Sequence, residues 1–596
     1  MKPFCAVDFE SFWDGECSVK PLGTVGYTRH PKFDAYMVSI WCPEVQYVGD
    51  PYAAPWDRIR DRMWLSHNAG FDIAVHQWLL KQPKLPKTAR FLPLEWNCTS
   101  SLAVYLGAPR SLAGAAKFLL QKNLSKGMRN WAKGKSGADI RAAGVEPKSG
   151  RSYWDLMCEY GLSDSEHCYH LWARYAHHWP EAERRLSRQT YIDCARGVYL
   201  DLPLLRKNLK HIRKVNHEAE LAIPWTKEGE KPTSPKALRR YCADAGIPAP
   251  ISVDEKDERY IAWEGKYGDT VDWVDKMRTW RKSNTILKRL ETMDRRVDVN
   301  GCMTFGMKYF GAHTGRWSGD EGVNMTNPPR DEHFGINVRK LIVAPKGFKF
   351  VIVDLAQIEP RCLAWLCGDE ALLQMVRDGF PIYEVHARKT MGWNGGKLKA
   401  EDPAKYALAK ARVLSLGYGA GAAKFVIMAK NYCDIDLPLA EAEMHVAQFR
   451  MSNPKITKLW NQLDIAFKRA GLIRKGEPNI FHLELPSGRV MRYLNVSLAN
   501  GARAQTTMGG IMKKAWGGLL TENLTQATAR EVFVHGLSAL HAAKIHVPFH
   551  LYDEYVCQVP TNFDKREIVE RVTRCPSWIE GLPLEAEAVE SDFYKK

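Results

Sequence analysis

The sequence lacks the features of membrane-spanning and exported proteins. No run approaches the roughly 18 uninterrupted apolar residues that a membrane-spanning helix requires. The first residues reach the acidic Asp8 before the apolar stretch of a signal peptide can develop. Internal repeats and low-complexity segments are also absent. The sequence therefore predicts a soluble protein built from ordinary globular domains.

The sequence also lacks paired cysteines. Its 14 cysteines are scattered, and the closest two, Cys362 and Cys367, do not form a Cys-x-x-Cys pair. This pattern in a long chain is typical of reduced, intracellular cysteines and does not predict structural zinc.

What the sequence does have is positive charge. Its 85 lysines and arginines against 68 acidic residues give a net charge of +17. Such a surplus favours nucleic acid as a partner, because basic side chains release counterions from the phosphates they contact. A basic surface without any partner would give the same total, so the charge alone leaves both interpretations open.

The 596 residues are too many for one hydrophobic core and predict about two to four domains. A first block begins with an apolar strand at residues 4–8 and extends to about Ser187, with a Gly/Lys-rich loop expected at 134–150. A helical, basic segment follows to about Asp298, although long charged helices usually present only a solvated face. A third block opens with an apolar strand at residues 350–354.

Acidic residues gather in three places in the first block. Asp8 and Glu10 lie two apart on the predicted strand, so both carboxylates face the same side. Asp72 follows a short apolar segment, and Tyr160 precedes Asp164 by one helical turn. Each acid alone is best explained as a surface residue. Together they match phosphodiester hydrolysis, which uses two cations about 4 Å apart held by several carboxylates.

These three patterns resemble the motifs of the DEDD-type 3′–5′ exonucleases, namely Asp8-x-Glu10, Asn68-x-x-x-Asp72 and Tyr160-x-x-x-Asp164. The segment 98–112 is similar to the stretch between the second and third motifs of that family. The resemblance implies an RNase H-like exonuclease domain at residues 1–187. It also implies that Asp8, Glu10, Asp72 and Asp164 bind metal and that Tyr160 positions the attacking water.

Two acidic segments far apart in sequence frame the third block. Asp354 ends the strand at 350–354, and residues 550–559 predict two short strands that meet at a turn around Asp553 and Glu554. An isolated example of this pattern is more often a salt bridge than a metal site. Phosphoryl transfer, however, needs two cations, and aspartates on neighbouring strands would bridge them.

A helix with a regular polar face is predicted between these segments. Tyr406, Lys410, Leu414 and Tyr418 recur every four residues and so share one face, and Gly417, Gly419 and Gly421 end the helix. Lys410 would contact a triphosphate as a point charge. A core helix with a solvated lysine explains the same pattern, and it is the better explanation when this helix is considered alone.

Together, these segments resemble family A DNA polymerases. Residues 354–361, 410–421 and 552–554 are similar to motifs A, B and C, while 281–285, 314–318, 324–328, 338–339 and 486–489 match other segments in the family's order. The resemblance implies an α/β multidomain protein in which a right-hand polymerase follows the exonuclease domain. It places the thumb and the start of the palm at 188–345 and the palm at 346–596, with fingers inserted at about 370–480.

The resemblance also implies roles for single residues. Asp354 and Asp553 would bind two Mg²⁺ ions, for which Mn²⁺ can substitute, and Glu554 would support the primer end. The residues around the dNTP would be Lys410, Tyr418, Glu359, Arg361 and Leu414. Glu359 would crowd a ribose 2′-hydroxyl and so favour DNA synthesis. The DNA-binding residues would be Arg316, Arg339, Gln505, Lys282, Lys288 and Arg489.

Four positions depart from the family pattern, namely Pro360, Tyr406, Leu414 and Tyr552. They bear on sugar discrimination and rate rather than on the metal pair. The segment 416–421 resembles a phage-type branch of the family. The resulting prediction is a monomeric, proofreading phage polymerase in the cytoplasm of a bacterial host, away from membranes. It would act on primer–template DNA and dNTPs with phage or host replication factors.

Two other functions remain as alternatives. A single-subunit RNA polymerase shares the palm, and Glu359 argues against it. A DNA-binding scaffold with decayed sites would also be basic, but every carboxylate expected of the two metal sites is present.

Overall fold

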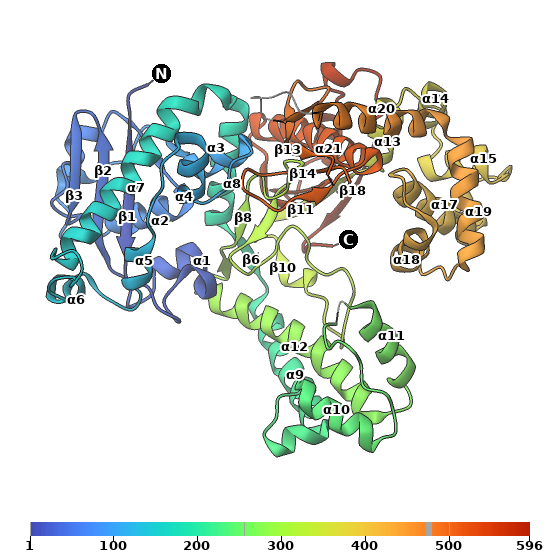
Figure 1. Ribbon diagram of the computed structural model, residues 1–596, viewed down its shortest axis with the longest axis horizontal. Helices are drawn as coiled ribbons and strands as arrows, with labels where there is room; N and C mark the ends of the chain where they lie inside the picture. Colours follow the sequence, from blue (N-terminus) through green and yellow to red (C-terminus); the bar gives the residue numbers. More distant parts are fainter. Residues whose placement is uncertain (1, 256, 473–478, 500, 596) are drawn as a thin grey trace.

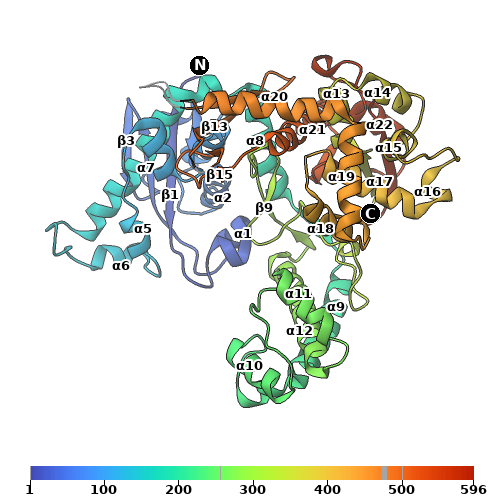
Figure 2. The same cartoon turned by 45° about the vertical axis from the view of Figure 1, so that its right-hand side comes forward.

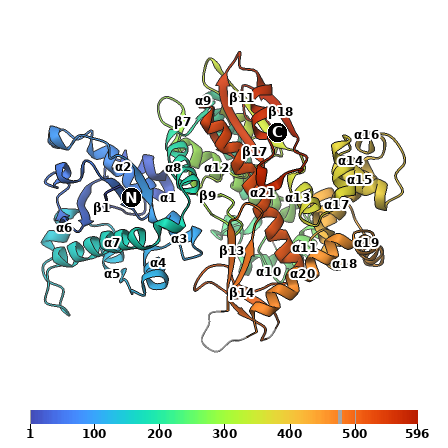
Figure 3. The ribbon, with the colours of Figure 1, turned by 90° about the horizontal axis from the view of Figure 1, so that it is seen from above.

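The computed structural model describes residues 2–255, 257–472, 479–499 and 501–595. They form a mixed α/β, multidomain protein with three visible parts (Figure 1). We refer to residues 2–196 as the N-terminal block, to 202–296 as the helical arm, and to 302–595 as the C-terminal block. Seen from above, the N-terminal block lies on one side of the C-terminal sheets, and helices α14–α19 lie on the other (Figure 3).

The N-terminal block is built on a five-stranded sheet in the order β3-β2-β1-β4-β5. Its strands are β1 (Phe4–Ser11), β2 (Ala35–Cys42), β3 (Val45–Gly49), β4 (Met63–Ser66) and β5 (Trp96–Cys98). β1 runs antiparallel to β2 and parallel to β4. The helices α1 (Val19–Thr28), α2 (Ala69–Leu79), α3 (Thr99–Tyr105), α7 (Tyr153–Tyr175) and α8 (Glu181–Arg196) surround it, and α7 contacts β1 and β2. The predicted strand at 4–8 is confirmed.

The Gly/Lys-rich stretch at 134–150 is not entirely a loop, as the sequence predicted. It contains α6 (Gly137–Ala142). The Ser136 hydroxyl accepts a hydrogen bond from the Asp139 backbone N–H, and the Asp139 carboxylate accepts one from the Ser136 backbone N–H. This capping box satisfies the first N–H groups of the helix and compensates for the low helix propensity of Gly137.

The helical arm projects from the centre of the molecule (Figure 1). Its two long helices, α9 (Leu202–Ala222) and α12 (Asp272–Arg296), pack against each other and carry the two most basic segments. The shorter helix α10 (Pro235–Asp244) lies at its far end, and α11 (Glu258–Tyr267) lies beside α12. A small core of its own, including Trp225, Leu238 and Trp263, holds the arm together.

The main sheet of the C-terminal block has the order β16-β17-β11-β18, and all its neighbours are antiparallel. The strands are β11 (Phe348–Leu355), β16 (His546–His550), β17 (Glu554–Pro560) and β18 (Ala586–Ser591). The sequence 350–353 is continuously apolar because β11 is a central strand buried on both faces. The strands predicted at 350–354 and 550–559 are confirmed.

A second sheet, in the order β12-β13-β14-β15, adjoins a group of helices. Its strands are β12 (Phe481–Glu484), β13 (Val490–Ser497), β14 (Arg503–Gln505) and β15 (Lys513–Lys514). The helices are α13 (Ile358–Leu366), α14 (Glu370–Arg377), α15 (Ile382–Thr390), α16 (Leu398–Glu401), α17 (Pro403–Leu416), α18 (Ala422–Cys433), α19 (Leu439–Ser452) and α20 (Pro454–Ala470). The α20 helix crosses the top of the molecule and contacts α21 (Gly517–Ala542), β12 and β13 (Figure 2).

One hydrophobic core joins the N-terminal and C-terminal blocks, because it includes Leu65 and Trp172 as well as Val353 and Phe533. No helix in the described part of the chain is long and apolar enough to cross a membrane.

Candidate active sites

The first candidate site lies where β11 and β17 end side by side. In their antiparallel register Asp354 is directly opposite Glu554. The backbone N–H of Leu355 donates to the carbonyl of Asp553 at 2.9 Å. Three carboxyl-bearing residues, one from β11 and two consecutive ones at the start of β17, therefore meet at one edge of the main sheet.

Glu554 is buried behind this edge and is fixed by an aromatic partner. The Tyr594 hydroxyl donates to its Oε1 at 2.6 Å, and burial together with the nearby Glu554 carboxylate raises the pKa of Tyr594. The Arg339 guanidinium lies 4.8 Å from the Tyr594 ring centre and donates to the Pro328 carbonyl at 2.9 Å. Arg339 was predicted to bind DNA, but it is only 1% exposed, and its guanidinium contacts Tyr594 and Pro328 inside the protein.

Glu359 links the segments that surround these acids. It lies in the first turn of α13, and its carboxylate accepts hydrogen bonds from Arg316 and, at 3.5 Å, from the Tyr418 hydroxyl. The Arg316 guanidinium also lies 5.3 Å from the ring centre of Tyr552. Residues from four separate segments thus adjoin the ends of β11 and β17.

The predicted helix is α17, which ends at Leu416 with Gly417 as its cap, so Tyr418 lies just beyond the helix and not on its face as predicted. Within the described residues, no carboxylate lies within ion-pair distance of Lys410, which is half-buried. Tyr406 packs edge-on against Tyr383, with ring centres 5.7 Å apart, and Leu414 packs against the same core. Tyr418 packs against a neighbouring core, so three of the four predicted residues are also used for packing.

The other predicted nucleotide- and DNA-binding residues differ in exposure. Arg361 is buried and donates to Glu585 Oε2 at 2.7 Å, while Arg489 donates to Glu531 at 2.8 Å and to the Thr314 carbonyl. Gln505 lies on β14, where its amide donates to the Gly510 carbonyl. Lys282 and Lys288 are exposed on α12.

The second candidate site lies in the N-terminal block, where four carboxylates face one another. Asp8 and Glu10 come from β1, Asp72 from the first turn of α2, and Asp164 from the middle of α7. Burial, and then the neighbouring Asp72, Glu10 and Asp164, raise the pKa of Asp8. Burial and Asp164 raise the pKa of Glu10 to about 8, and burial raises the pKa of Asp72 to about 7. The structure therefore brings together the acids that the sequence predicted as one site.

A basic side chain that sequence reasoning missed lies among these acids. The Lys126 ammonium donates to Asp164 Oδ2 at 2.9 Å and to the Tyr160 hydroxyl at 3.4 Å. Asp72 is held by the Phe9 backbone N–H at 3.0 Å and by the Ser66 hydroxyl. The only sequence signal for Lys126 was its place in a basic segment before the Gly/Lys-rich stretch.

The donor chemistry of both sites suits magnesium, although the side chains as they stand do not enclose an ion. Among the described residues, no group of three or more His, Cys, Asp and Glu side chains is arranged to hold a metal. Mg²⁺ usually takes one or two protein carboxylates and completes its shell with waters and substrate phosphates. Asp354 and Asp553 fit that requirement, as do Asp8 and Asp164 once Lys126 releases the latter.

Comparison with known proteins finds similarity to DNA polymerases. Residues 264–477 match DNA polymerase family A. A DNA polymerase of Bacillus phage SP02 is 27% identical over 580 residues, which cover 85% of this chain and 86% of that protein. Residues 264–477 are therefore similar to a family A DNA polymerase domain, and most of the chain is similar to a phage DNA polymerase.

Other similarities agree with these matches. A thermostable DNA polymerase I of Thermus filiformis is 27% identical over 47% of this chain and 33% of that enzyme. A solved structure, the POL domain of Pol1 from M. smegmatis in complex with DNA primer-template and dNTP, superposes with a TM-score of 0.68. It covers 100% of this chain and 96% of the other at 16% identity, and so shows the likeness of fold.

Sequence reasoning also missed two polar residues near the first candidate site. Glu522 and Gln526 lie one turn apart on α21, and the Gln526 amide donates to Glu522 at 3.1 Å. Burial and the Glu359 carboxylate raise the pKa of Glu522, which places it beside the first candidate site. Two polar residues at helical spacing in a mostly buried helix were the available signal.

Proposed function

We propose that this chain is a template-directed, DNA-dependent DNA polymerase of a phage and carries a 3′–5′ proofreading exonuclease. The exonuclease would occupy residues 1–187, the thumb and start of the palm 188–345, and the palm with its inserted fingers 346–596. The observation that carries the proposal is the β11–β17 register, which pairs Asp354 with Glu554 and sets Asp553 beside them. The family match and the phage relative support it.

In the polymerase reaction, the primer 3′-oxygen bonds to the α-phosphorus of a dNTP, and pyrophosphate leaves. Asp354 and Asp553 would hold Mg²⁺, which activates the attacking hydroxyl and stabilises the charge on the phosphates. Lys410, with no carboxylate partner among the described residues, is available to the triphosphate as a point charge. Glu359, held by Arg316 and Tyr418, would limit the space beside the sugar.

In the exonuclease reaction, a water oxygen bonds to the terminal phosphorus and the 3′-oxygen of the shortened strand leaves. Asp8, Glu10, Asp72 and Asp164 would hold Mg²⁺ for this step, and Tyr160 would orient the water. The support is that Asp72, Glu10 and Asp164 all raise the pKa of the buried Asp8, and that Asp164 also raises the pKa of Glu10, so these carboxylates lie near one another.

A labelled primer–template incubated with Mg²⁺ tests both activities. With all four dNTPs the primer should lengthen, and without dNTPs it should shorten. Asp354→Ala should abolish lengthening and leave shortening intact, whereas the double variant Asp8→Ala, Glu10→Ala should do the reverse. Loss of both activities in either variant, with the fold preserved, would contradict two separate sites.

A further inference from the structure

The edge hairpin of the second sheet, which we call the ribbon, contacts the N-terminal block. It comprises residues 503–514, in which β14 and β15 pair Arg503 with Lys514 and Ala504 with Lys513. At its tip, the Met508 backbone N–H donates to the Gly107 carbonyl at 2.9 Å. Phe118 lies so close to Gly509 that a Cβ on this glycine would be 2.5 Å from the Phe118 ring. The tip of the ribbon therefore rests on the N-terminal block.

The charges on this ribbon are not balanced within the protein. Arg503 and Lys514 are directly opposite each other, an arrangement of like charges that destabilises an antiparallel pair. In the described residues, no carboxylate lies within 4.0 Å of Arg503, Lys513 or Lys514. The Nε of Arg503 is buried and lacks a hydrogen-bond acceptor there, which costs free energy unless an acceptor is supplied. Both features are explained if an anion binds across the ribbon.

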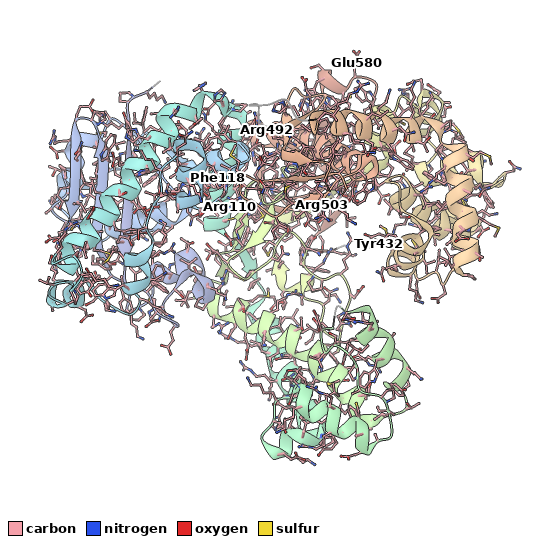
Figure 4. The ribbon with its side chains drawn as sticks, viewed as in Figure 1. Arg110, Phe118, Tyr432, Arg492, Arg503 and Glu580 are labelled. Atoms are coloured by element: carbon pink, nitrogen blue, oxygen red, sulfur yellow. The ribbon has the colours of Figure 1, made fainter. Side chains whose placement is uncertain are left out.

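The surroundings of the ribbon favour a nucleic-acid strand as that anion. Figure 4 shows Arg492 and Arg503 on the C-terminal side of the junction and Arg110 and Phe118 on the N-terminal side. Phe118 is 40% exposed, and the Lys117 ammonium lies 5.8 Å from its ring centre. Single-stranded nucleic acids bind surfaces that combine cations with exposed aromatic rings. The phosphates pair with the cations, and a base stacks on the ring.

We propose that the ribbon binds the phosphates of single-stranded DNA that crosses between the two blocks, with Phe118 as a stacking surface at its tip. Arg503 and Lys514 contact the backbone, and Arg492 extends the basic track on β13. The crossing itself rests on the proposed function, because a primer end moves to the N-terminal block only if that block shortens it. The binding of a single strand can be measured independently.

The test measures the binding of a fluorescent single-stranded oligonucleotide to the full chain by anisotropy, in EDTA and over a range of salt concentrations. For the double variant Arg503→Ala, Lys514→Ala, we expect the slope of log affinity against log salt to decrease by about 1.4, or roughly 0.7 for each lost phosphate contact. The matched control is Lys81→Ala, Lys84→Ala, which removes two exposed charges elsewhere on the N-terminal block. Slopes equal to that control would overturn the proposal.

Two further variants separate binding from folding. Lys514→Glu places a carboxylate opposite Arg503, so its melting temperature should be unchanged or higher while single-strand affinity falls. Phe118→Ala should weaken single-strand binding about tenfold, because it removes the ring on which a base would stack. A lower melting temperature of Lys514→Glu, or unchanged affinity in Phe118→Ala, would contradict this assignment.

Two outcomes distinguish the ribbon from the proposed nuclease. Binding is measured in EDTA, where metal-dependent cleavage cannot occur, and shortening is measured separately in Mg²⁺. If the wild type binds single strands through the ribbon but does not shorten primers in Mg²⁺, only the proposed nuclease is refuted. If the double variant loses affinity for a blunt duplex as strongly as for the single strand, the ribbon contacts duplex DNA and the single-strand proposal is wrong.

Discussion

At the scale of single residues, the Glu359 carboxylate of the first candidate site is held by two partners. Arg316 and the Tyr418 hydroxyl both bond to its carboxylate, although they come from segments before and after it in the chain. A carboxylate fixed from two sides cannot easily turn away from a bound nucleotide. If it acts as the proposed barrier to the ribose 2′-hydroxyl, its size and these two contacts would set how well it does so.

We expect Glu359→Ala to reduce discrimination against ribonucleotides by at least about tenfold, which corresponds to roughly 1.4 kcal/mol. The reason is that the shorter side chain leaves room for the 2′-hydroxyl. The measurement is kcat/KM for single incorporation of a dNTP and of the matching NTP. Glu359→Gln, which keeps the size, serves as the control and should retain most of the discrimination. An unchanged ratio in Glu359→Ala would show that another residue excludes the ribose.

Lys126 is the residue whose removal should change metal binding in the N-terminal block. Its ammonium pairs with Asp164 at 2.9 Å, with side chains only 31% and 9% exposed, and therefore competes with a divalent cation. We expect Lys126→Met to bind Mn²⁺ roughly fivefold more tightly, since such a pair contributes about 1 kcal/mol. Electron paramagnetic resonance of Mn²⁺ in an Asp354→Ala, Asp553→Ala background isolates this site.

Lys126→Arg is the control for this experiment, because it retains the positive charge and should bind Mn²⁺ like the parent protein. If Lys126→Met binds Mn²⁺ no more tightly than Lys126→Arg does, the ammonium does not compete with the metal.

The acidic residues could be predicted from the sequence because their spacing depends only on local strand and helix geometry. Asp8 and Glu10 lie two apart on β1, and Tyr160 and Asp164 lie four apart on α7. The contact between Lys126 and Asp164 could not be predicted in this way, because it depends on how a loop packs against a distant helix. Likewise, no local pattern shows that Arg361 is buried against Glu585.

At the scale of elements, α8 links the two blocks through a buried acid. Asp193 faces Gln189, whose amide donates to its Oδ1 at 2.8 Å, and His546 of β16, whose Nε2 lies 4.0 Å away. Burial raises the pKa of Asp193 to about 7, although Gln189 and Arg196 act in the opposite direction. Burial likewise lowers the pKa of His546, so this histidine does not supply a matching positive charge.

The raised pKa of Asp193 predicts a pH dependence of stability. The folded state favours the protonated carboxyl, so its contribution is fully present below about pH 4 and is lost as the pH rises through about 7. We expect the unfolding free energy of Asp193→Asn relative to the wild type to increase by about 3 kcal/mol between pH 5 and pH 8, because the wild type loses this much as the pH rises toward 7. Denaturant unfolding at both pH values measures this difference.

The control is Asp57→Asn, which changes an exposed acid and should shift stability equally at both pH values. If Asp193→Asn also shifts stability equally at pH 5 and pH 8, then burial does not disfavour the Asp193 carboxylate.

Elements with strong local signals could be predicted, and elements held by tertiary contacts could not. The four-residue spacing and the glycines after it predicted α17, which ends at Leu416 with Gly417 as its cap. The ribbon of β14 and β15 has no apolar alternation and places like charges opposite each other, so its pairing was not predictable. It forms because its neighbours, β13 on one side and Gly107 at the tip, supply backbone partners.

At the scale of the whole molecule, the net charge of +17 must be divided between surfaces with different partners. The single strand is proposed to follow the ribbon. The exposed lysines of the helical arm lie on a separate part of the molecule, which projects away from the N-terminal block (Figure 1). Lys282 and Lys288 lie on α12, and among the described residues neither has a carboxylate within ion-pair distance. The arm is therefore expected to bind the phosphates of the primer–template duplex.

We expect Lys282→Ala, Lys288→Ala to decrease the salt slope of duplex binding by about 1.8, because each phosphate contact on B-form DNA contributes roughly 0.9. The same variant should leave the slope for single-stranded DNA unchanged, whereas the ribbon variant should do the opposite. This crossed result would assign the positive charge of the molecule to two separate DNA paths. If both variants reduce both slopes equally, the charge acts as one diffuse field and neither surface is specific. An unchanged duplex slope would remove Lys282 and Lys288 from the interface.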